Sequence, residues 1–156
     1  MSVGRPNPIA RGLLLTFLIA LFAVVLTPSD NHAAMGVIAR ISLWLSGFGL
    51  SYHEVFLSLE FLANIVLFLP LGFLLPFAFR FPRQSRYLVI ILPTFFGLGI
   101  SLLIEMTQLW IPGRVSDPRD LVANAMGAFL GAWVAAAIRV HLESRGNSKQ
   151  QFVGVS

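Results

Sequence analysis

Several ionisable and amide side chains interrupt stretches of this sequence that are otherwise apolar. A carboxylate inside a membrane helix costs about 2.5–3.5 kcal/mol on insertion scales, so it should face the protein interior and find a partner. Carboxylates accept hydrogen bonds, amides add neutral ones, and a guanidinium can hold a carboxylate or phosphate through two parallel bonds. The candidate ligand-binding residues are Asn64, Glu105, Gln108, Arg114, Asp117, Asp120 and Asn124.

Four apolar segments must position these side chains. They cover about residues 12–27, 57–79, 87–111 and 121–140, each close to the roughly 20 residues that a helix needs to cross a hydrocarbon core of about 30 Å. The chain is 56% hydrophobic and only 12% charged, with a mean hydropathy of +0.80. We therefore expect an all-α, membrane-embedded bundle of four transmembrane helices.

The first apolar segment and the loop after it form the N-terminal part. Arg5 and Arg11 precede this segment as in a signal peptide, but no small-x-small cleavage site follows, so an uncleaved helix is expected. In the loop, GVIARISLWLSGF has apolar residues at helical spacing. It predicts a short interfacial helix on the outer leaflet or, equally, a helix that covers the bundle.

Charge asymmetry gives the expected orientation. Most Lys and Arg residues flank the segments on one side, as Arg80, Arg83 and Arg86 do, whereas the other side has only Arg40, Arg114 and Arg119. The positive-inside rule places both termini in the cytoplasm of a multi-pass protein of the bacterial cell membrane. Because the basic residues follow topology, nucleic-acid binding has little support.

The expected organisation has three parts: residues 1–56 with the first span and outer loop, residues 57–140 as a three-helix core, and residues 141–156 as a disordered cytoplasmic tail. The chain has no cysteine, which excludes disulfides and thiolate chemistry. No metal and no cofactor are predicted. Oligomerisation stays open.

Depth in the membrane groups the polar residues. At 1.5 Å per residue, Glu105 lies about 9 Å below the outer end of its segment, Asn64 about 10 Å and Asn124 about 6 Å. Their helical spacing also pairs Glu60 with Asn64 and Asp120 with Asn124 on single faces. We interpret this as one polar pocket that opens outward. In the alternative interpretation the groups only satisfy each other: Glu105 pairs with Arg114, Asp120 caps the last helix and the amides bridge helices.

Small residues predict where the helices meet. Lipid gives helices no hydrophobic reason to associate, so rows of small residues mark close contacts. The last segment has such a row, and three prolines should kink or loosen the second and third segments. The row is Ala123, Gly127, Gly131 and Ala135, and the prolines are Pro70, Pro76 and Pro93.

Two stretches, NIVLFLPLGFLLP and SLLIEMTQLWIPGRVSDPRDLVANAMGAFLG, resemble the VanZ-like family of small bacterial integral membrane proteins. The resemblance covers about residues 64–131. One departure is Ala125, where family members often have threonine. The resemblance implies a membrane protein and a link to low-level teicoplanin resistance, and it supplies no reaction. The matched positions are Asn64, Pro70, Gly72, Ser101, Glu105, Gln108, Arg114, Asp117, Asp120, Asn124, Gly127 and Gly131.

Three functions are compatible with these residues. The first is a non-catalytic binding or accessory role at the cell envelope, with a membrane lipid, a lipid-linked envelope precursor or a lipoglycopeptide as partner and Arg114 as its anion-binding group. The second is an intramembrane enzyme with Glu105 as acid or base; Asp117 and Asp120 would hold a divalent cation, and Ser101 is a weaker nucleophile candidate. The third is a structural subunit or a proton-coupled carrier.

Overall fold

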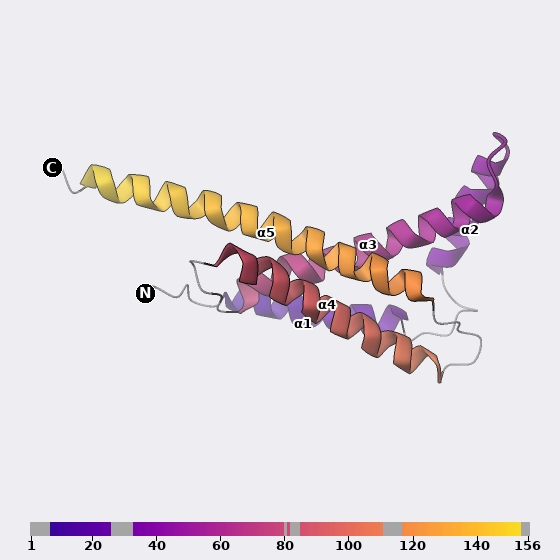
Figure 1. The fold of residues 1–156 in the computed structure, drawn as a ribbon, viewed down its shortest axis with the longest axis horizontal. Coiled ribbons are helices and arrows are strands. Elements are labelled where there is room, and N and C mark those ends of the chain that lie inside the picture. The colour runs from indigo at the N-terminus through magenta and orange to yellow at the C-terminus, as the bar shows by residue number, and fades with distance from the viewer. Residues whose placement is uncertain (1–6, 26–32, 80, 82–84, 111–116, 154–156) are drawn as a thin grey trace.

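The computed structural model describes residues 7–25, 33–79, 81, 85–110 and 117–153, with the side chains of residues 25, 33, 34 and 143–153 excepted. This part of the chain forms five helices and no strand (Figure 1). The helices are α1 (Pro8–Val25), α2 (Ala33–Ser46), α3 (Tyr52–Ala78), α4 (Arg86–Gln108) and α5 (Pro118–Val153). The all-α prediction is confirmed.

Polar side chains cap the starts of α1 and α4. The side chain of Asn7 accepts a hydrogen bond from the backbone N–H of Ile9 at 2.9 Å, directly before Pro8. Ser85 caps α4 by accepting from the N–H of Leu88 at 3.3 Å. These side chains satisfy backbone donors that have no partner within the first turn of a helix.

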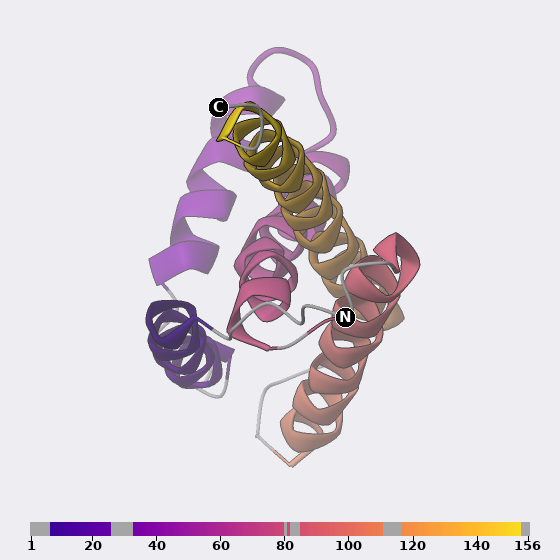
Figure 2. The same cartoon turned by 90° about the vertical axis from the view of Figure 1, so that its left-hand side faces the viewer.

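Helix α3 is the centre of the bundle. It packs against all four other helices, and Figure 2 shows it with α1, α4 and α5 around it. The hydrophobic core follows this arrangement, because it joins residues of α1, α3 and α4. Its buried members are Ala10, Leu14, Leu21, Phe68, Leu71, Leu75, Ala78 and Ile104.

The contact between α3 and α5 depends on glycine. A Cβ atom on Gly72 would overlap the backbone of Ala128, and one on Gly127 or Gly131 would overlap the backbone of α3 at Ile65 or Leu69. The two backbones can approach this closely only because these positions have no side chain. The predicted small-residue face of the last helix is therefore buried against protein.

Arginines from two helices hold the C-terminal end of α3. Arg11 of α1 donates through Nε to the carbonyl of Ala78 at 2.9 Å, and Arg139 of α5 donates through Nη1 to that of Pro76 at 3.2 Å. The last carbonyls of a helix lack partners within it, and that end carries partial negative charge. The two guanidinium groups donate hydrogen bonds to these carbonyls and bring positive charge to this end of the helix.

Two helix lengths differ from expectation. Among the described residues, only α3, α4 and the Pro118–Leu142 part of α5 are long and apolar enough to cross a membrane; α1 is apolar but shorter. Helix α5 continues to Val153, so residues 141–153 are helical where a disordered tail is expected. This stretch has no proline, and it includes residues with good helix propensity such as Leu142, Glu143 and Lys149.

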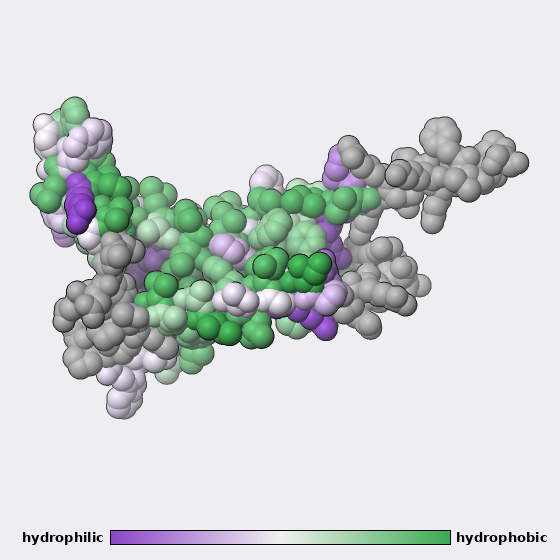
Figure 3. All heavy atoms as spheres, turned by 180° about the vertical axis from the view of Figure 1, so that it is seen from behind, coloured by the Kyte–Doolittle hydropathy of each residue, from purple (hydrophilic) through white to green (hydrophobic). Residues whose placement is uncertain are grey.

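The outside of the bundle is apolar. Large hydrophobic side chains are exposed along α1, α4 and α5, including Ile19, Phe95 and Trp133. Figure 3 shows hydrophobic residues over most of the middle of one face, with hydrophilic residues toward its two ends. A surface of this kind suits hydrocarbon and is unfavourable in water.

Candidate functional site

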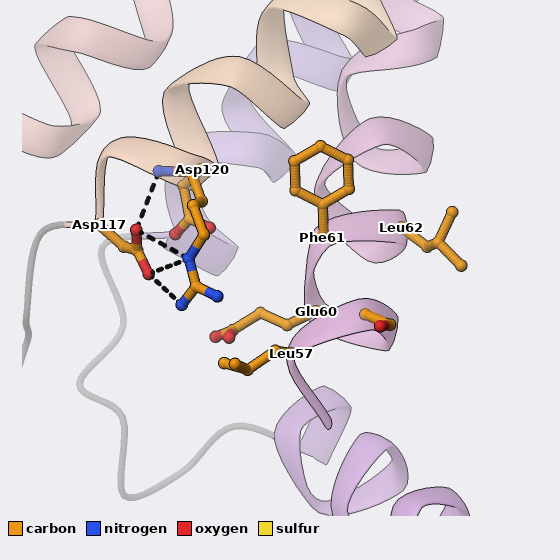
Figure 4. A pocket seen from close by; sticks show the side chains of 8 residues that line it. Leu57, Glu60, Phe61, Leu62, Asp117 and Asp120 are labelled. Carbon is orange, nitrogen blue, oxygen red and sulfur yellow. Dashed lines mark hydrogen bonds and ion pairs between the residues drawn. The ribbon is translucent and has the colours of Figure 1, made fainter. Parts of the chain in front are cut away.

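A groove lies between α3 and the first turn of α5 (Figure 4). Its volume is about 520 Å³. In Figure 4, Glu60 and Leu57 extend from α3 toward Asp117 and Asp120 at the start of α5, whereas Leu62 points to the other side of α3. The groove therefore combines charged groups on one side with an apolar wall. The lining residues are Leu57, Ser58, Glu60, Phe61, Leu62, Asp117, Arg119 and Asp120.

Asp117 and Arg119 form a fixed ion pair at the mouth of the groove. Arg119 donates to one Asp117 oxygen through Nη2 at 2.6 Å and Nε at 3.0 Å, and its backbone N–H donates to the other at 2.9 Å. These bonds from the Arg119 side chain and backbone hold the pKa of the Asp117 carboxyl below its ordinary value. Asp117 is thus the N-cap of α5, followed by Pro118 at the first helical position.

Asp120 faces α3. Its Oδ1 accepts a hydrogen bond from Nδ2 of Asn64 at 2.7 Å, which joins the two helices at the base of the groove. The carboxylates of Glu60 and Glu105 are near enough to act on Asp120 electrostatically. Acidic groups from three helices therefore converge here.

A second polar contact lies one helical turn deeper. Asn124 donates through Nδ2 to Oγ of Ser101 on α4 at 2.8 Å, and both residues are buried. The Oδ1 atom of Asn124 is buried and has no hydrogen-bond partner among the described residues. Glu105 and Gln108, on the same helix as Ser101, are 7% and 6% exposed. Burying an acceptor such as Asn124 Oδ1 costs free energy of folding unless a hydrogen-bond donor reaches it.

The candidate residues fall into two connected layers. Asp117 and Asp120 line the groove, with Asn64 bonded to Asp120. Asn124, Glu105 and Gln108 are buried between α4 and α5 and do not line it. Arg114 lies outside the described residues. All described candidates thus occupy one end of the bundle.

One specific pairing differs from the alternative interpretation. The cap of α5 is Asp117, whereas Asp120 bonds to Asn64. Both amides bridge helices as that interpretation expected, because Asn64 of α3 bonds to Asp120 of α5 and Asn124 of α5 bonds to Ser101 of α4. Depth along a helix places a residue to within a turn, and the rotation of each helix decides which neighbours meet.

Sequence reasoning gave Glu60, Ser101 and Arg119 smaller roles than the structure does. Glu60 lines the groove, Ser101 is the partner of Asn124, and Arg119 holds Asp117. The order Asp-Pro-Arg was an available signal, because an aspartate directly before a proline is typical of a helix start.

Some groups that could take part in chemistry are already engaged in the described part of the chain. No cluster of three or more His, Asp or Glu residues suited to a metal ion occurs in the described part of the chain, and Asp117 is engaged by Arg119. Ser101 accepts a hydrogen bond from the Asn124 amide, and an amide N–H cannot remove the proton of a hydroxyl. The groove offers hydrogen-bonding and charged side chains beside apolar ones.

Comparison with known protein families shows which family this chain belongs to. The sequence profile of the VanZ/LLP1 family matches residues 14–139, which is most of the protein. The chain belongs to the VanZ/LLP1 family. No curated protein and no solved structure matched it.

Family membership and the long apolar helices together make this VanZ-family chain a membrane protein. The match reaches well beyond the two sequence stretches that carry the resemblance, because it begins within α1 and includes α2. In this VanZ fold, Gly72, Gly127 and Gly131 serve the contact of α3 with α5. The polar residues of the same stretches gather at the groove and just beneath it.

Proposed function

We propose that this VanZ-family protein is a non-catalytic binding or accessory protein of the bacterial cell envelope. Its ligand is a lipid-linked envelope molecule or an acylated glycopeptide, whose polar part enters the groove from the outer surface. The observation that carries the proposal is the convergence of Glu60, Asp117, Arg119 and Asp120 on one groove beside the apolar side chains of Leu57 and Phe61. An amphipathic ligand needs both kinds of contact at one place.

In the proposed topology, α1 is a fourth span and both termini are cytoplasmic. Helix α1 begins and α5 ends at the same end of the bundle, whereas the start of α5 lies at the opposite end (Figure 1). Arg11 and Arg139 lie at the end shared by the termini, as the positive-inside rule requires of a cytoplasmic side. The groove then faces outward.

Helix α2 is proposed to lie in the outer interface. It packs on α3 and buries Ser42 completely, yet it leaves Val37, Leu43 and Trp44 more than half exposed. A helix that only covered the bundle would bury those large side chains. Exposed apolar residues beside the groove would help an acyl chain to remain in the membrane while its polar head binds.

The test is drug susceptibility in a sensitive Gram-positive host. We expect wild type to raise resistance to teicoplanin, which carries an acyl chain, and to leave vancomycin susceptibility unchanged. Asp120→Asn, which removes the charge but keeps an acceptor for Asn64, should abolish most of the protection at equal abundance in the membrane. The matched control is Glu54→Gln, which removes an exposed charge at the start of α3 outside the groove.

Each result has a separate meaning. Protection that Asp120→Asn removes and Glu54→Gln preserves supports a binding groove. Loss of the Asp120→Asn protein from the membrane would instead mean that the polar network is structural. A wild type that protects against neither drug would contradict the proposed link with glycopeptide resistance.

A further inference from the structure

The end of the bundle opposite the groove carries an excess of positive charge. Helix α1 contains no acidic residue, and Glu143 is the only one in α5 beyond its first turn. Helix α4 begins at this end and contributes an exposed arginine. An excess of one sign of charge attracts partners of the other sign. The basic residues of the three helices at this end are Arg11, Arg86, Arg139, Arg145 and Lys149.

Arg11 and Arg139 approach the end of α3 from two different helices. Their hydrogen bonds to the carbonyls of Ala78 and Pro76 hold both guanidinium groups at the last turn of α3. The two carbonyls are about 3 Å apart along the helix axis, and the backbone N–H of Asn7 donates to the carbonyl between them at 3.2 Å. Two positive charges are therefore held near each other before any ligand arrives, which lowers the entropy cost of binding.

Each of these two guanidinium groups keeps N–H donors that α3 does not use. Among the described residues, Arg11 donates through Nε and Arg139 through Nη1, and their other N–H groups have no partner there. Neither forms an ion pair with a described carboxylate. The end of α3 contributes about half a negative charge, which is less than the charge of either arginine. The pair thus stays positive and can donate to the oxygens of a phosphate.

Exposed apolar side chains flank both arginines. Ile9 and Leu13 of α1 are 71% and 55% exposed, and Leu142 of α5 is 59% exposed. Each lies within three positions of Arg11 or Arg139 in the sequence. A soluble phosphate makes no use of such a surface, whereas a phospholipid packs its acyl chains on it and places its headgroup at the level of the arginines.

We propose that Arg11 and Arg139 bind the phosphate of an anionic phospholipid, whose acyl chains lie against the apolar side chains beside them. This lipid site lies at the opposite end of the bundle from the groove, so it does not depend on what the groove binds. Helix α1 packs mainly against α3. The bound headgroup adds a link from α1 to α5 across the end of α3.

The test is native mass spectrometry of the purified full-length protein in detergent. Phosphatidylglycerol and phosphatidylcholine with the same acyl chains are added, because both carry a phosphate but only phosphatidylglycerol has a net negative charge. We expect phosphatidylglycerol to be retained on the order of tenfold more, since each basic residue beside an anionic headgroup favours binding about fivefold. Inorganic phosphate should not displace it, because phosphate lacks the acyl chains.

Variants connect retention with the two arginines. Arg11→Gln and Arg139→Gln should each lower retention of phosphatidylglycerol about fivefold, while the glutamine amide still offers a donor to α3. If these variants do not fold, Arg11→Lys and Arg139→Lys, which keep the charge but lose the planar fork of donors, should lower it less. The matched control is Arg40→Gln, which removes an exposed arginine from α2 and should leave retention unchanged.

Three outcomes would overturn the inference. Equal retention of the two lipids would remove the anionic headgroup, and displacement of phosphatidylglycerol by inorganic phosphate would replace the lipid by a soluble anion. Retention that Arg119→Gln lowers, and that the Arg11 and Arg139 variants do not, would place the anionic lipid in the groove. None of these results touches the proposed function of the groove, which drug susceptibility tests separately.

Discussion

At the residue scale, the buried contact between Asn124 and Ser101 joins α5 to α4. Ser101 is completely buried and accepts a hydrogen bond from the Asn124 amide at 2.8 Å. A small residue such as serine is also common where two membrane helices pack closely. The structure assigns it both roles, because a small side chain permits the close approach and its hydroxyl accepts from the amide.

Ser101→Ala should therefore destabilise the protein. The change keeps the small volume but leaves the buried Nδ2 group of Asn124 without its acceptor, at a cost of roughly 0.5–2 kcal/mol for an interhelical bond. Reversible unfolding in mixed micelles would measure it. Ser58→Ala is the matched control, because Ser58 is exposed and donates within its own helix to the carbonyl of Glu54 at 2.8 Å. Equal stability of the two variants would contradict the assigned role of Ser101.

At the scale of helices, small residues decide the packing. The apolar segments could be recognised from the sequence because each is long and poorly charged, and the face of Gly127 and Gly131 could be recognised from its spacing. The pairing of Asn64 with Asp120 could not, since it depends on how α3 and α5 rotate about their axes. The helical continuation to Val153 was also missed, because polarity was interpreted as disorder.

Gly131→Ala should weaken the contact of α5 with α3. The added Cβ would overlap the carbonyl oxygen of Leu69 and the backbone nitrogen of Phe73, and neither can move without shifting a helix. Overpacking of this kind costs about 1–3 kcal/mol. Unfolding in detergent and the amount of protein in the membrane would report it. Gly99→Ala is the control, because no atom lies within 4 Å of its added Cβ; a Gly99→Ala variant as unstable as Gly131→Ala would contradict the packing explanation.

At the scale of the whole molecule, two kinds of polar group lie at opposite ends of the bundle. Arginines of α1 and α5 hold the C-terminal end of α3 at the end where α1 begins. Carboxylates and amides gather at the other end, between the starts of α3 and α5 and the end of α4. An apolar exterior connects the two ends. This arrangement suits a protein that is fixed in a membrane and binds a molecule from one side of it.

The central claim is that the groove holds the polar part of a specific envelope molecule, and crosslinking in living cells tests it most directly. A photoreactive residue replaces Leu57, which lines the groove, or, as a control, Phe95, which is exposed on α4 outside it. After irradiation, the adducts are identified by mass spectrometry. We predict that position 57 captures a distinct amphipathic species, that Asp120→Asn abolishes this adduct, and that position 95 captures bulk phospholipid. The same phospholipid adducts at both positions, unchanged by Asp120→Asn, would contradict the account.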